Sequence, residues 1–216
     1  MRDAYHDSLD AITDELVSMS RLVATMMHRA SAALLESDRE KAEAVIESDV
    51  EIDSIQQEVE LAATELIALQ QPVATDLRMV LAAMRISTTL ERMGDLAQHV
   101  AKTARMRYPD SAVPSNVLEQ FREMAEVADR MGAKMAEVLG SKDLELAREI
   151  EADDDRMDAL HRQVLDILLS QEPGPVNQAV DVTLLNRYFE RYADHAVSVA
   201  RRVVYLVTGE KAVPLY

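Results

Sequence analysis

Four pairs of acidic residues share one spacing, in which an acid is followed four positions later by Asp. Two pairs lie in the first half of the chain and two in the second half. They are Asp49 with Asp53, Glu91 with Asp95, Asp154 with Asp158, and Glu190 with Asp194. On a helix this spacing places both carboxylates on one face, with Cβ atoms about 5–6 Å apart. Each pair therefore predicts a short ladder of negative charge.

The chemistry that suits such ladders is cation binding. Like charges at this spacing destabilise a helix by roughly 0.2–0.5 kcal/mol, and a bound cation reverses the sign of that repulsion. Two facing pairs supply four carboxylates, which suit Mg, Mn, Fe or Zn. The chain has no cysteine, so thiolate metal sites are excluded. The alternative interpretation is that these acids form an ordinary solvated face.

His99 continues the line of Glu91 and Asp95 by a further four positions and is an additional candidate ligand. Ser198 stands at the corresponding position of the second half. His161 and His195 also lie beside the acidic pairs, and we interpret them as spectators rather than ligands.

Apolar residues recur every three or four positions along most of the chain, and this periodicity predicts six long helices. With only five Gly and six Pro to interrupt it, the chain favours an all-α fold. Ser37 with Glu40 predicts a capping box at the start of the second helix, and Asn116 with Glu119 predicts another at the fourth. Pro72 suits the first turn of the third helix. Residues 109–115 and 171–175 are the predicted loops.

The two halves of the chain repeat one pattern. A shift of 105 positions carries Asp49 onto Asp154, and a shift of 99 carries Glu91 onto Glu190. Such internal self-similarity is typical of duplicated structural units. We therefore predict two tandem three-helix bundles related by internal duplication, over residues 1–109 and 110–216. The helical wheel places Glu91 opposite the apolar stripe of its helix, so we expect any metal cluster on the solvent side of the bundle.

The overall charge limits the classes of partner. With 39 acidic against 23 basic residues, the formal net charge is −16, which argues against nucleic-acid binding. No segment approaches the roughly 20 apolar residues that span a bilayer. Residues 1–7 lack the pattern of a signal peptide. We expect a cytoplasmic protein without direct membrane insertion.

Three segments resemble the PhoU family of phosphate-signalling proteins: residues 71–78 (QPVATDLR), 90–95 (LERMGD) and 189–194 (FERYAD). The resemblance covers essentially the whole chain. It implies a non-catalytic regulator of phosphate uptake and phosphate-starvation signalling that acts beside the membrane through its partners. The implied partners are a phosphate ABC transporter ATPase and a sensor histidine kinase, through which transcription is regulated negatively. The resemblance also implies a homodimer and metal clusters on the acidic pairs.

Carried over residue by residue, the resemblance predicts two metal sites. The first comprises Asp49, Asp53, Glu91 and Asp95, and the second comprises Asp154, Asp158, Glu190 and Asp194. Asp76 is a further candidate for the first site, and it has no counterpart in the second half. This difference, with Ser198 in the place of His99, favours the first site as the metal binder.

Two other functions remain open on the sequence. A carboxylate-bridged metalloenzyme is disfavoured because the chain contains no Glu-x-x-His motif, which di-iron bundles carry on two helices. No Gly-rich phosphate loop offers another chemistry. A metal-free helical scaffold, with its acids merely solvated, is the second alternative.

Overall fold

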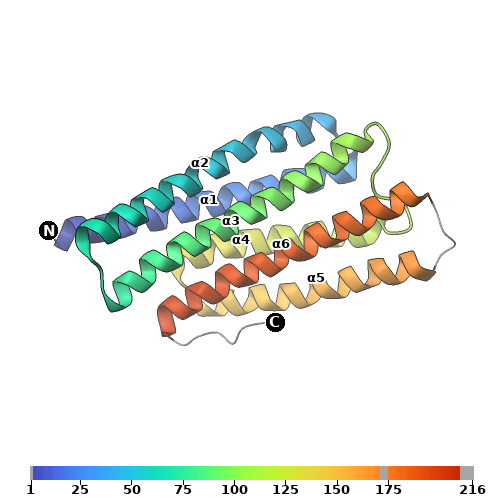
Figure 1. Ribbon diagram of the computed structural model, residues 1–216. Helices are drawn as coiled ribbons and strands as arrows, with labels where there is room; N and C mark the ends of the chain where they lie inside the picture. The colour runs from blue at the N-terminus through green and yellow to red at the C-terminus, as the bar shows by residue number, and fades with distance from the viewer. Residues whose placement is uncertain (1, 171–174, 210–216) are drawn as a thin grey trace.

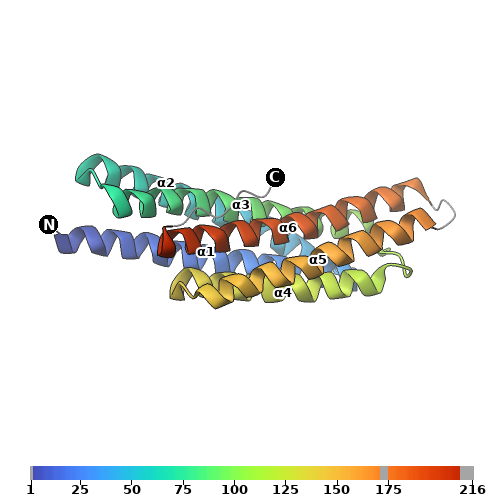
Figure 2. The ribbon, with the colours of Figure 1, turned by 90° about the horizontal axis from the view of Figure 1, so that it is seen from below.

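Long apolar periodicity produces six α-helices, and the part of the chain that the structure describes contains no strand. The computed structural model describes residues 2–170 and 175–209, with side chains from residue 7 onward. The helices are α1 (Arg2–Glu36), α2 (Arg39–Gln70), α3 (Ala74–Arg107), α4 (Leu118–Ser141), α5 (Leu144–Ser170) and α6 (Val176–Thr208). Their axes are nearly aligned with one another, so the molecule is elongated (Figures 1 and 2). The all-α prediction is confirmed.

The helices form two three-helix bundles, as predicted. Helices α1, α2 and α3 pack on one another, and so do α4, α5 and α6. The bundles meet through α1 against α4 and α3 against α6, which places α2 and α5 on opposite outer sides (Figure 1). One continuous apolar cluster contains core residues of all six helices. The boundary predicted at residue 109 falls in the connection between α3 and α4.

Small residues let the two bundles approach closely at α1 and α4. A Cβ placed on Gly132 of α4 would lie 2.9 Å from Ala24 Cβ of α1 and 3.0 Å from the Tyr192 hydroxyl of α6. Real Cβ atoms do not come this close, so only glycine fits here. Gly132 therefore sets the separation of the two halves.

Helix ends depart from the sequence prediction at three places. The N-cap of α2 is Asp38, whose Oδ1 accepts a hydrogen bond from Lys41 N at 3.0 Å, so the predicted capping box of Ser37 is wrong. Ser37 instead takes a left-handed backbone conformation, with φ of 52°. Helix α3 begins at Ala74 rather than at Pro72. Helix α4 begins after Val117 without a side-chain cap.

At the start of the fifth helix, Asp143 Oδ1 accepts a hydrogen bond from Glu145 N at 2.8 Å. Of the loop predicted at 171–175, residues 171–174 lie outside the described part of the chain. Within the described residues, none of the helices is both long and apolar enough to cross a membrane.

Candidate functional site

The first acidic cluster, defined as Asp49, Asp53, Glu91 and Asp95, is built by the hairpin of α2 and α3. These helices pack against each other beside the acidic pairs, where Gly94 of α3 faces Ile52 of α2. A Cβ placed there would lie 3.4 Å from Ile52 Cγ2 on α2. The fold therefore brings the two ladders together along one seam.

Electrostatic coupling across the seam shows that the four carboxylates share one neighbourhood. Burial raises the pKa of Asp49, and the charges of Asp53 and of Asp95 on the other helix raise it further. Burial also raises the pKa of Glu91, followed by Asp95 and, to a smaller degree, by Asp53 and Asp49. The predicted juxtaposition of the ladders is thus present in the structure.

The cluster lies deeper than the helical wheel indicates. The Glu91 side chain is 22% exposed and that of Asp95 is 33% exposed. In the second half the Glu190 side chain is only 13% exposed. The expected solvent side holds for Asp53 and Asp194, which are exposed, whereas Glu91 and Glu190 are partly buried, so each cluster lies at the surface with one side buried in the bundle.

Cationic and amide side chains already form ion pairs or hydrogen bonds with part of the first cluster. The Arg92 guanidinium lies 3.2 Å from Asp95 Oδ2 and 3.4 Å from Glu91 Oε2. Gln98 Nε2 donates a hydrogen bond to Asp49 Oδ2 at 2.6 Å, and the Lys102 ammonium donates to Gln98 Oε1. Sequence reasoning missed this support, although Gln98 and Lys102 continue α3 at a spacing of four.

The second cluster, defined as Asp154, Asp158, Glu190 and Asp194, repeats the arrangement on α5 and α6. Burial, followed by the charges of Asp194 and Asp158, raises the pKa of Asp154 to about 7. Burial also raises the pKa of Glu190, and Asp194 raises it further, while Arg187 and His161 oppose the shift. The coupling again crosses between the two helices.

Arginines also pair with part of the second cluster. Arg187 forms an ion pair with Glu190, and Arg162 lies 3.8 Å from Asp158. No hydrogen bond or ion pair within the described residues reaches the Asp154 carboxylate. Glu190 Oε2 and His161 Nδ1 are buried without a hydrogen-bond partner in the same part of the chain. His161 is therefore closer to this cluster than its interpretation as a spectator allows, and its position three residues after Asp158 was the available signal.

Of the two additional candidates for the first site, His99 lies beside the cluster and Asp76 does not. The His99 ring stacks on Tyr188 of α6, with ring centroids 5.3 Å apart, although its charge still acts on Asp49. Asp76 stands fifteen residues before Glu91 on the same helix, which corresponds to about 22 Å at 1.5 Å per residue. Asp76 therefore does not join the first cluster.

The family model of the PhoU domain matches this chain twice, over residues 16–104 and 121–203, once in each bundle. Similar curated proteins include the phosphate-specific transport system accessory protein PhoU homolog 2 of Mycobacterium tuberculosis. It is 45% identical over 210 residues, covering 97% of this chain and 99% of that protein. Homolog 1 of Mycobacterium leprae is also 45% identical, over 97% of this chain and 95% of that protein. This chain belongs to the PhoU family.

Solved structures of the family agree with this assignment. The crystal structure of PhoU from Pseudomonas aeruginosa superposes with a TM-score of 0.87 at 25% identity, over 95% of this chain and all of that one. The structure of the phosphate transport system regulatory protein PhoU from Streptococcus pneumoniae gives 0.83 at 26% identity, over 97% and 100%. The predicted resemblance to the PhoU family is confirmed.

The donor chemistry of both clusters in this PhoU-family chain suits a hard or borderline cation. The pKa values of these carboxylates are raised by burial and then by mutual repulsion, and within the described residues Glu190 Oε2 is buried without a partner; a cation would stabilise such groups. In the described part of the chain, however, no three Asp, Glu or His side chains converge in the geometry that holds a metal ion. A cation shared by one of these clusters would need the carboxylates to rotate toward one another.

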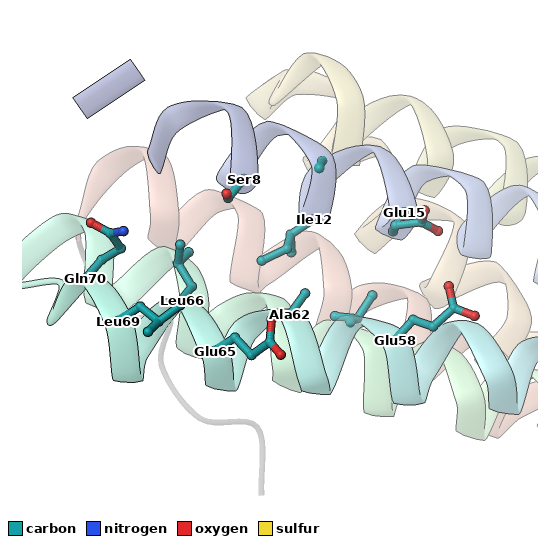
Figure 3. A pocket seen from close by; sticks show the side chains of 11 residues that line it. Ser8, Ile12, Glu15, Glu58, Ala62, Glu65, Leu66, Leu69 and Gln70 are labelled. Carbon is teal, nitrogen blue, oxygen red and sulfur yellow. The ribbon is translucent and has the colours of Figure 1, made fainter. Parts of the chain in front are cut away.

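A groove of about 390 Å³ lies between α1 and α2 (Figure 3). Its floor is apolar and includes the buried side chains of Ile12, Val59 and Leu66. Carboxylates stand along it, and no lysine or arginine is among its lining residues. The acidic members are Glu15, Glu58 and Glu65. Leu69 at one end is 77% exposed.

Proposed function

We propose that this chain is a non-catalytic regulator of phosphate uptake and phosphate-starvation signalling. The observation that carries the proposal is the double match to the PhoU domain, together with 45% identity to proteins named as phosphate-specific transport system accessory proteins. A regulatory rather than enzymatic role is supported by the sequence, which has no Glu-x-x-His motif and no Gly-rich phosphate loop.

The regulator acts by binding proteins in the cytoplasm beside the membrane. Its proposed partners are the ATPase of a phosphate ABC transporter and a sensor histidine kinase, whose phosphate-replete state it helps to hold. The groove between α1 and α2 is the surface that we propose for one of these contacts. Its apolar floor and acidic rim complement a partner helix with an apolar face flanked by Lys or Arg. Its lining on α2 runs from Glu58 to Gln70, about 18 Å, or roughly three turns of a docked helix.

The proposed regulator also binds cations through its two acidic clusters. Cation binding would remove the repulsion that raises the pKa values of Asp49, Glu91, Asp154 and Glu190. It would also tie together the second and third helices of each half. The homodimer implied by the family resemblance stays a prediction.

Affinity capture from phosphate-replete cells tests the proposed function. Tagged wild-type chain should recover the transporter ATPase or the sensor kinase. Glu58→Lys combined with Glu65→Lys should reduce that recovery, because it reverses the charge of the groove. Glu60→Lys is the matched control, since Glu60 is exposed on the same stretch of α2 and does not line the groove. Recovery of neither partner by the wild-type chain would contradict the proposal, and equal recovery by all variants would remove the groove from it.

A further inference from the structure

Helices α3 and α6 belong to different bundles and pack antiparallel in a regular register. The Arg107 guanidinium of α3 bonds to the buried Asp181 carboxylate of α6. Eight residues earlier on α3, His99 stacks on Tyr188, which lies seven residues later on α6. A move toward the N-terminus of α3 therefore corresponds to a move of nearly the same number of residues toward the C-terminus of α6.

The same register brings two arginines face to face. Arg92 lies seven residues before His99 on α3, and the register places it opposite His195 of α6. Burial lowers the pKa of His195, and the charges of Arg191 and Arg92 lower it further. Seven residues further back is Arg85, which the register places at Arg202. Burial lowers the pKa of Arg202, and the charge of Arg85 lowers it further, with no carboxylate acting against the shift.

Both arginines lack a counter-charge. In the described part of the chain, no ion pair or hydrogen bond reaches the guanidinium group of Arg85 or of Arg202. The Nε of Arg202 is buried there without an acceptor. Along the same two helices, Arg107 and Arg201 both pair with carboxylates, whereas the guanidinium groups of Arg85 and Arg202 do not. Two repelling guanidinium groups with an unused buried donor are stabilised when an anion binds between them.

We propose that Arg85 and Arg202 form an anion site at the seam between the two bundles, and that its ligand is a phosphate group. A guanidinium fork binds tetrahedral oxyanions through parallel N–H···O hydrogen bonds. Two forks from opposite helices match a doubly charged oxyanion. The ligand is inorganic phosphate or the phosphate of a phosphomonoester, since both present the same group. The choice of phosphate over other oxyanions rests on the proposed function, whereas the site itself does not.

The proposed site differs in origin from the acidic clusters. Thr103 and Leu184 stand at the repeat-related positions, so the arginine pair is not a product of the duplication. It joins α3 of the first half to α6 of the second half, and Arg92, one step along the seam, bonds to the first cluster. A bound phosphate would therefore hold together the two helices on which Glu91, Asp95, Glu190 and Asp194 stand.

Calorimetric titration of chelator-treated, full-length protein tests the site. The separate titrants are inorganic phosphate, glycerol 3-phosphate and sulfate. The variants are Arg85→Gln and Arg202→Gln. Arg105→Gln is the matched control, because Arg105 is exposed on α3 and has no ion pair within the described residues. Wild type and the control should bind phosphate, and each seam variant should lose affinity by about tenfold or more.

Thermal unfolding provides a second readout, which distinguishes loss of the anion site from misfolding of a variant. Without ligand, Arg85→Gln should unfold at the same or a higher temperature than wild type, because the repulsion with Arg202 is removed. With phosphate, the Tm of wild type should rise and that of Arg85→Gln should not. Tighter binding of glycerol 3-phosphate than of inorganic phosphate would identify a phosphomonoester as the ligand. No binding by wild type at about 10 mM phosphate, or equal binding by all variants, would overturn the site. Equal affinity for sulfate would overturn its assignment to phosphate.

Discussion

The two acidic clusters occupy equivalent places in the two bundles, yet they face different counter-charges. In the first cluster Arg92 reaches both Glu91 and Asp95, and Gln98 binds Asp49. The second cluster repeats the carboxylates, but no hydrogen bond or ion pair in the described part of the chain reaches Asp154. Burial and then the neighbouring carboxylates raise the pKa of Asp154 to about 7, and the charge of Arg201 offsets this shift only in part.

This difference shows that duplication preserved the carboxylates while the surrounding charges diverged. Arg191 stands where Arg92 stands in the first half, but within the described residues it forms no ion pair with the second cluster. We therefore expect the second cluster to gain more from a bound cation than the first. The sequence favoured the opposite order because of His99 and Asp76, which the structure places against Tyr188 and about 22 Å along the helix.

The largest expected effect comes from Asp154→Asn in chelator-treated protein. A carboxyl with a pKa near 7 instead of the ordinary 3.8 costs the folded state about 4 kcal/mol at pH 8 without screening, and about 2 kcal/mol for a half-buried group. Asp154→Asn should raise the free energy of unfolding at pH 8 by about 2 kcal/mol, measured by urea denaturation.

The pH dependence has a defined sign. Because the folded state binds the Asp154 proton more tightly, the wild-type free energy of unfolding should fall as the pH rises from about 4 to about 7. The advantage of the asparagine variant should vanish at pH 4. Asp49→Asn is the matched variant of the first cluster, and its gain should be smaller because Gln98 already bonds to Asp49. Equal gains in the free energy of unfolding for Asp154→Asn and Asp49→Asn would contradict the expected difference between the two clusters.

A smaller effect is expected when the counter-charge of the first cluster is removed. Arg92→Gln leaves Glu91 and Asp95 facing each other uncompensated, and should lower the free energy of unfolding by about 0.5–1 kcal/mol at low ionic strength. Arg191→Gln, at the repeat-related position, should change it little. The difference should shrink in high salt. A larger loss in Arg191→Gln would reverse our assignment of the counter-charges.

The smallest effect tests the packing beneath the first cluster. Gly94→Ala installs the residue type that stands in the second half as Ala193. The new Cβ would contact Ile52 Cγ2 at 3.4 Å, an ordinary contact, while alanine favours the helix. The free energy of unfolding should rise by about 0.5 kcal/mol. A decrease in thermal stability would show that the close approach of α2 and α3 depends on glycine.

Helical periodicity and the repeat offsets were sufficient to predict the six helices, the two bundles and the facing of acidic pairs such as Asp49 and Asp95. These features depend on spacing, which a sequence displays directly. The prediction for the N-cap of α2 was wrong because Ser37 and Asp38 both offer a capping oxygen, and the chain geometry at the turn selects Asp38. Contacts between the halves, such as His99 with Tyr188 or Arg107 with Asp181, depend on a register between distant helices that no local pattern encodes.

We propose that each bundle gathers cations between its two carboxylate ladders. Metal analysis of protein purified without chelators tests it most directly, with wild type compared to Asp95→Ala and Asp194→Ala. Wild type should carry bound metal, each variant should carry less, and Asp194→Ala should lose more than Asp95→Ala. Equal metal content in all three proteins, or none in wild type, would contradict the claim and support the metal-free scaffold.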